Sequence, residues 1–130
     1  MKKTALLLTI AALVGGLSSA GLAAGSSGSF TGTWKLSVAC KGYSQINTLR
    51  IWTANQSDVR GTTNVGDGYG QIVGGSFDGA NVTFFNQYTW NGKHESEVWK
   101  GHLSRDGQYL VGSFKSTSQS TLCAFEGPRR

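Results

Sequence analysis

Three features are scarce in this sequence: charge, cysteine and long apolar runs. Charged residues make up 15% of the 130 residues, whereas aromatic residues make up 11%. Disordered chains combine many charges with few aromatic residues, so this composition excludes an intrinsically disordered protein. A chain of this length is enough for one domain, which excludes a large multi-domain enzyme.

The apolar run from Ala5 to Val14 is much shorter than the roughly 20 residues that a membrane-spanning helix needs. Two lysines precede the run, and small residues that a signal peptidase reads follow it and end at Ala20. We therefore predict that residues 1–20 are a cleaved signal peptide, with Ala23 as a second cleavage position. The alternative is an N-terminal membrane anchor. Residues 21–29 are rich in Gly, Ser and Ala and are expected to form a flexible lead-in.

A cleaved leader predicts a soluble protein, secreted or periplasmic, with no membrane partner. Its removal lowers the formal net charge from +5 to +3. The remaining basic residues stand singly, except for Arg129 and Arg130 at the end of the chain. Nucleic-acid surfaces need clustered positive charge with interleaved aromatic residues, so we expect no nucleic-acid partner.

Turn signals recur about every 10 to 15 residues from Phe30 onward, and pairs such as Asn91-Gly92 and Asp106-Gly107 favour tight hairpins. Between them lie segments rich in Thr, Val, Ile and aromatic residues. The eight strands that we predict span Thr33 to Cys40, Gln45 to Thr53, Val59 to Val65, Gln71 to Phe77, Val82 to Trp90, His94 to Leu103, Gln108 to Lys115 and Thr121 to Glu126.

Apolar side chains in these segments alternate with polar ones, as in the stretch from Trp34 to Cys40, and no segment shows helical spacing. The connections are too short for parallel crossovers, so the strands form an antiparallel meander. Such a sheet hides its edges as an up-and-down barrel or as a two-sheet sandwich. We predict an all-β domain over residues 30–127, folded as an eight-stranded antiparallel barrel.

The two cysteines, Cys40 and Cys123, favour the barrel. In a closed meander the end of the first strand lies beside the start of the eighth, which places these residues together. A disulfide is the expected state in an exported chain, and two free buried thiols are the alternative.

A resemblance to a known family rests on four stretches between residues 30 and 126. They are Phe30-Thr31-Gly32-Thr33-Trp34, Arg60-Gly61-Thr62, Gly74-Gly75-Ser76-Phe77 and the segment that contains Trp90 and Trp99. In these stretches the chain resembles the avidin and streptavidin family, which implies an eight-stranded barrel with a small ligand in its mouth. That family follows its opening tryptophan with an asparagine and a serine that hold biotin, whereas this chain continues with Lys35 and Leu36. The resemblance therefore implies the barrel and a small ligand rather than biotin itself.

Large amphipathic rings are the candidate ligand-binding residues, because they can line a pocket and leave a polar tip to orient a ligand. An eight-stranded barrel either fills with its own side chains or holds one small molecule, and the composition allows both. The candidates are Trp52, Tyr69, Tyr88, Trp90 and Trp99. They predict a non-enzymatic binding protein for a small-molecule or carbohydrate ligand, with no cofactor.

The sequence contains few residues that are spaced as catalysis or metal binding would require. Glu95 and Glu97 share a strand face about 7 Å apart, but paired carboxylates of glycosidases face each other across a substrate, so we expect a solvated stripe. His94 and His102 are about 27 Å apart along a strand and cannot share a metal ion. We therefore predict neither catalytic nor metal-ligating residues.

The alternative function is an exported protein-interaction module or enzyme inhibitor. It would present the loop Gly66 to Gly70 or the loop Ser116 to Ser120 to a target protein, since loops on rigid scaffolds carry function. Phe85 beside Phe84 places at least one ring on the outer wall, which predicts self-association into a homo-oligomer.

Overall fold

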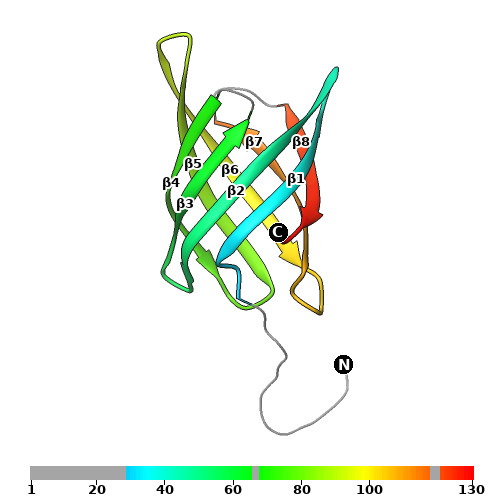
Figure 1. The fold of residues 1–130 in the computed structure, drawn as a ribbon. Helices are drawn as coiled ribbons and strands as arrows, with labels where there is room; N and C mark the ends of the chain where they lie inside the picture. Colours follow the sequence, from blue (N-terminus) through cyan, green and yellow to red (C-terminus); the bar gives the residue numbers. More distant parts are fainter. Residues whose placement is uncertain (1–28, 66–67, 118–120) are drawn as a thin grey trace, which may run out of the picture.

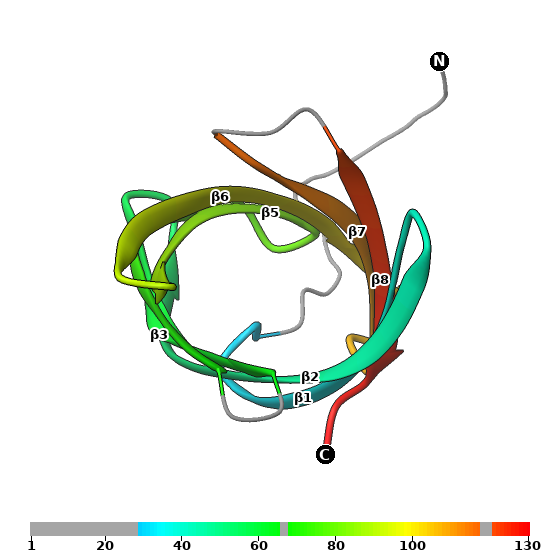
Figure 2. The same ribbon diagram turned by 90° about the horizontal axis from the view of Figure 1, so that it is seen from above.

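The computed structural model describes residues 29–65, 68–117 and 121–130, and these fold as one closed all-β barrel. Each strand pairs with the next along the chain, and the last pairs with the first, so that the strands form a ring when seen end-on (Figure 2). The predicted eight-stranded antiparallel meander is therefore confirmed. The predicted signal peptide, residues 21–28 of the lead-in and parts of the loops Gly66 to Gly70 and Ser116 to Ser120 lie outside the described residues.

Most strands are longer than the sequence predicted, because several continue into their turns, whereas β7 has the predicted length and is displaced by one residue (Figure 1). Asn91 and Gly92 adopt positive φ angles of 49° and 76°, the conformation that a tight hairpin requires. The eight strands are β1 (Gly32–Cys40), β2 (Tyr43–Asn55), β3 (Asp58–Val65), β4 (Gly68–Phe77), β5 (Asn81–Trp90), β6 (Lys93–Leu103), β7 (Tyr109–Ser116) and β8 (Leu122–Pro128).

The seam between β1 and β8 closes the barrel. Its ladder runs from Ser37, opposite Glu126, to Ala39, opposite Ala124, and a separate bridge joins Trp34 to Arg129. Cys40, the last residue of β1, and Cys123, near the start of β8, lie at one end of this seam, with their Cα atoms 4.3 Å apart, and form a disulfide. The predicted pairing of these cysteines is confirmed.

The half of the barrel near the start of β1, which we call the lower half, is filled with apolar side chains. Phe30 precedes β1, is fully buried and packs its ring 5.7 Å from that of Trp34 and 5.6 Å from that of Phe77. The guanidinium of Arg129 lies 4.4 Å from the centre of the Trp34 ring and donates hydrogen bonds to the carbonyls of Ser29, Thr31 and Gly107. This end of the barrel is therefore plugged by the chain itself.

The upper end is the end that carries the β1–β2, β3–β4, β5–β6 and β7–β8 connections. In Figure 1 the β1–β2 and β5–β6 hairpins rise above the rest of the barrel at this end. The described residues include no helix with the length and apolarity needed to cross a membrane. Inward-facing side chains change from apolar to polar toward this end, and the candidate site lies there.

Candidate functional site

Four polar residues on four different strands face the interior of the upper half. Asn47 is 2% exposed, Thr63 and Asn86 are each 3% exposed, and Glu97 is half-buried. Each lies on the inner face because it alternates with outward-facing neighbours along its strand, as Asn86 does between Phe85 and Gln87. We call Asn47, Thr63, Asn86 and Glu97 the polar layer.

A chain of hydrogen bonds connects three members of the polar layer. The Thr63 hydroxyl donates to Asn86 Oδ1 at 3.0 Å, and Asn86 Nδ2 donates to Glu97 Oε1 at 3.0 Å. Thr63 reaches Asn86 across β4 because Gly70, on the strand between them, has no side chain. A Cβ added at Gly70 would lie 2.3 Å from the Thr63 hydroxyl oxygen and 2.5 Å from Asn86 Oδ1. The glycine is what makes room for this network.

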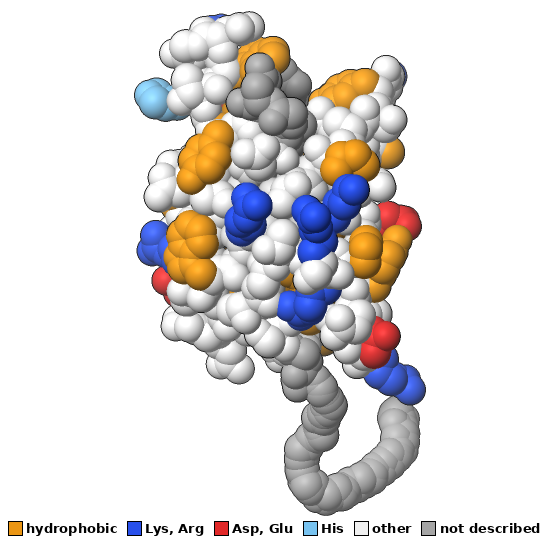
Figure 3. Space-filling model, viewed as in Figure 1, with side chains coloured by type: hydrophobic (Ala, Val, Ile, Leu, Met, Phe, Trp, Pro, Cys, Tyr) orange, Lys and Arg blue, Asp and Glu red, His pale blue; other side chains and the backbone are white. Residues whose placement is uncertain are grey.

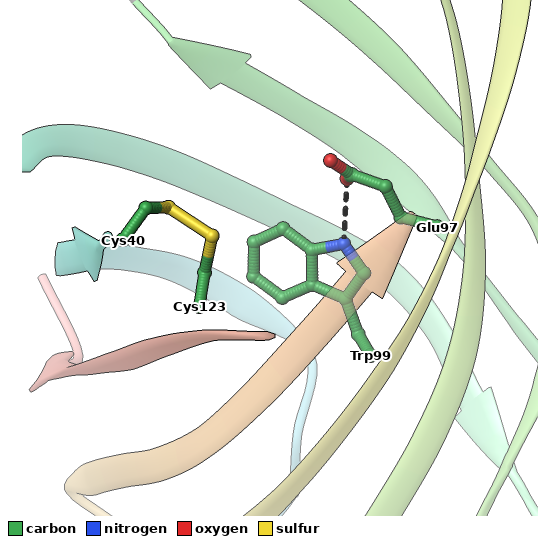
Figure 4. The surroundings of a disulfide bond; sticks show 4 residues. All are labelled: Cys40, Glu97, Trp99 and Cys123. Atoms are coloured by element: carbon green, nitrogen blue, oxygen red, sulfur yellow. Dashed lines mark hydrogen bonds between the residues drawn. A yellow bond between two sulfur atoms is a disulfide. The ribbon is translucent and has the colours of Figure 1, made fainter. Parts of the chain in front are cut away.

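Trp99 forms the floor beneath Glu97. Its ring is fully buried, stacks 4.2 Å from Phe114 and 5.2 Å from Phe84, and is tilted against Phe125. Its indole Nε1 donates a 2.9 Å hydrogen bond to Glu97 Oε1. Figure 4 shows the nitrogen-bearing side of the ring directed at Glu97 and the opposite side directed toward the disulfide. The boundary between the apolar core and the polar layer runs through this residue.

Burial sets the electrostatics of the site. Desolvation raises the pKa of Glu97 above its ordinary value, and the hydrogen bonds from Asn86 and Trp99 oppose this effect. Desolvation also raises the pKa of Tyr88 to about 12, with further contributions from the charges of Glu97, Glu95 and Tyr43. Both carboxylates therefore act on the same phenol, which indicates that these groups converge at the upper end.

Two polar atoms of the polar layer have no protein partner within residues 29–65, 68–117 and 121–130. Glu97 Oε1 accepts both hydrogen bonds described above, whereas no donor reaches Oε2. Asn47 Oδ1 accepts a hydrogen bond from the backbone N–H of Asn64 at 3.2 Å, whereas Nδ2 donates none. A buried polar group without a partner costs about 1–3 kcal/mol, so both atoms are suited to meet a ligand.

The five aromatic residues predicted as a ligand-binding set are not gathered in one place. Trp99 and Tyr88 border the polar layer, and Trp90 lies at the exposed upper end of β5. Trp52 and Tyr69 are 60% and 63% exposed on the outer wall. On the face shown in Figure 3, apolar side chains form separate patches with lysine and arginine side chains between them.

The carboxylates also differ from expectation. Glu95 and Glu97 share a face as predicted, but that face is the interior of the barrel rather than a solvated stripe. Alternation alone does not indicate which face is inner, and the buried neighbours Asn86 and Trp99 were the available signal. His94 and His102 are exposed and pair with Thr89 and Asn81. Within the described part of the chain, no three His, Cys, Asp or Glu side chains could jointly hold a metal ion.

Together, the fold and the site define a closed eight-stranded β-barrel with a plugged lower end and a polar upper interior. A redesigned β-barrel of known structure superposes with a TM-score of 0.61 at 11% sequence identity, covering 77% of this chain and 90% of that chain. This likeness shows the fold alone. No protein-family model and no curated protein matches the chain. The resemblance to the avidin and streptavidin family therefore stays a prediction.

Proposed function

We propose that this chain is an exported, non-enzymatic binding protein that holds a small polar ligand in the upper half of its barrel, above Trp99. The polar layer is the observation that carries the proposal. A barrel that needed only stability could fill this space with apolar side chains, as it does around Phe84 and Phe114. Buried polar groups that are held in place by hydrogen bonds, with two atoms left for a partner, are typical of small-molecule sites.

Export is supported by two independent features. The sequence begins with a basic, apolar and small-residue pattern that is typical of a signal peptide. A disulfide between Cys40 and Cys123 persists best in an oxidising compartment, such as the periplasm or the medium.

Calorimetric titration with a panel of neutral, cationic and anionic sugars, amino alcohols and amino acids tests the proposal. We expect saturable binding of at least one member, and loss of that binding in Asn86→Leu, which removes the central amide of the polar layer. Gln87→Leu is the matched control, because it makes the same kind of change one residue away on the outer wall. Equal loss in both variants, or binding by no member, would contradict the proposal and favour a loop-mediated interaction with a protein target.

A further inference from the structure

We infer that the polar layer selects a small hydroxylated amine, with an amino sugar as the simplest case, and that Glu97 holds its ammonium group. The inference rests on the proposed function, since it names the class of ligand that the same site takes. Three observations carry it: the sign of the charge inside the barrel, and an oxygen of Glu97 and the amide nitrogen of Asn47 that have no partner among the described residues.

The charge inside the upper half is negative. Glu97 and Glu95 occupy successive inward positions on β6. Lys93 is the next residue on that side of the strand, but it is exposed in the β5–β6 hairpin, and Lys41 is exposed in the β1–β2 turn. Among the described residues, both lysines thus stand at the rim and both carboxylates stand further inside. An anion entering the barrel would meet like charge, whereas a cation would meet opposite charge.

The carboxylate of Glu97 is oriented so that its second oxygen, Oε2, can accept a hydrogen bond from a ligand. Two N–H groups, from Trp99 and Asn86, fix Oε1 and orient the carboxylate. Both hydrogen bonds favour the ionised form, while burial favours the neutral form. An ammonium group on Oε2 would form a charge-assisted hydrogen bond and offset the cost of burying the charge.

Asn47 supplies the second requirement. Its side chain is almost fully buried on the inner face of β2, and its Nδ2 has no acceptor among the described residues. A simple alkylamine would satisfy Glu97 and leave this donor unpaired. A ligand that carries hydroxyl oxygens besides its amine can satisfy both, which is why the site favours a hydroxylated amine.

Glucosamine and glucose are the probes for the test, because they differ by a protonated amine in place of one hydroxyl group. Affinities of the folded, disulfide-bonded protein for each sugar are measured by calorimetry and NMR titration. We expect the wild-type protein to bind glucosamine about tenfold more tightly than glucose. Glu97→Gln keeps the size of the side chain and should remove the preference. Glu126→Gln is the matched control, since Glu126 is exposed on β8 and accepts a hydrogen bond from Tyr109.

Each outcome separates the inference from the proposed function. Equal affinity for the two sugars, or a preference that survives Glu97→Gln, overturns the inference and leaves the binding function standing. Binding of another panel member without glucosamine binding has the same meaning. Binding of neither sugar and of no panel member overturns both. Because the wild-type comparison needs no variant, it remains decisive if Glu97→Gln does not fold.

Discussion

Removing the disulfide is expected to open the barrel at one place. The bond between Cys40 and Cys123 joins residues 83 positions apart. Cross-linking a loop of this length lowers the entropy of the unfolded chain and stabilises the folded state by about 4.5 kcal/mol on the chain-entropy model. Replacing both cysteines with alanine should therefore remove a large part of the roughly 5–15 kcal/mol that separates folded from unfolded domains.

The loss should be concentrated at the seam. The ladder between β1 and β8 covers Ser37 to Ala39, whereas the ladder between β5 and β6 runs from Asn81 to Trp90. Without the covalent link, the short ladder should open before the long one. Urea denaturation gives the change in the free energy of unfolding, and hydrogen exchange of backbone amides gives its location. The wild-type protein under reducing conditions is the control and should behave as the double variant does.

Two results would refute this reasoning. A loss of unfolding free energy below about 1 kcal/mol would show that the covalent link does not constrain the unfolded chain as the chain-entropy model assumes. Equal acceleration of exchange in the seam and in the β5–β6 hairpin would show that the seam is not the weak junction.

Three further predictions concern single residues. Gly127→Ala should destabilise the protein by about 1–3 kcal/mol in thermal unfolding, because its Cβ would lie 1.9 Å from the Lys35 carbonyl oxygen; Gly74→Ala, with 3.9 Å to the nearest side-chain atom, should change little. Folding raises the pKa of Glu97 above its ordinary 4.5, so its contribution favours the folded state at low pH and is lost as the pH rises through the folded value. Glu97→Gln should therefore gain stability relative to wild type between acidic and neutral pH, and a constant difference would contradict this. Ultraviolet titration should show one phenol ionising near pH 12 that disappears in Tyr88→Phe.

The barrel itself could be predicted from the sequence. Regular turn signals and period-two alternation indicate the eight strands, and closure of an antiparallel meander is enough to place Cys40 beside Cys123. The tight hairpin at Asn91-Gly92 is local chemistry and was equally predictable.

Two β-bulges made it impossible to predict from the sequence which side chains of β2 and β4 face the interior. Counting by twos back from Ala54, which packs against the core, would place Trp52 inside, but the register shifts between Ile51 and Thr53. Counting back from Phe77 would likewise place Tyr69 inside, but a second shift between Ile72 and Gly74 turns it outward. A bulge adds one residue to a strand and so exchanges its two faces beyond that point.

The polar layer could not be predicted for a different reason. Asn86 acquires its role from Thr63 across β4 and from Glu97 on β6, and a single sequence carries no record of contacts between strands. A carboxylate on a period-two strand is most often solvated, and the burial of Trp99, two residues further along β6, shows that this one faces the interior.

The indole N–H resonance of Trp99 tests the binding proposal most directly, because this proton bonds to the carboxylate that the ligand is proposed to reach. The resonance is assigned by comparison with Trp99→Phe and followed in nitrogen-15-labelled protein during titration with glucosamine and the other panel members. The account predicts a saturable shift of this signal, together with the side-chain amide signals of Asn47 and Asn86. Binding that moves only the signals of the turns, while these three stay in place, would contradict it.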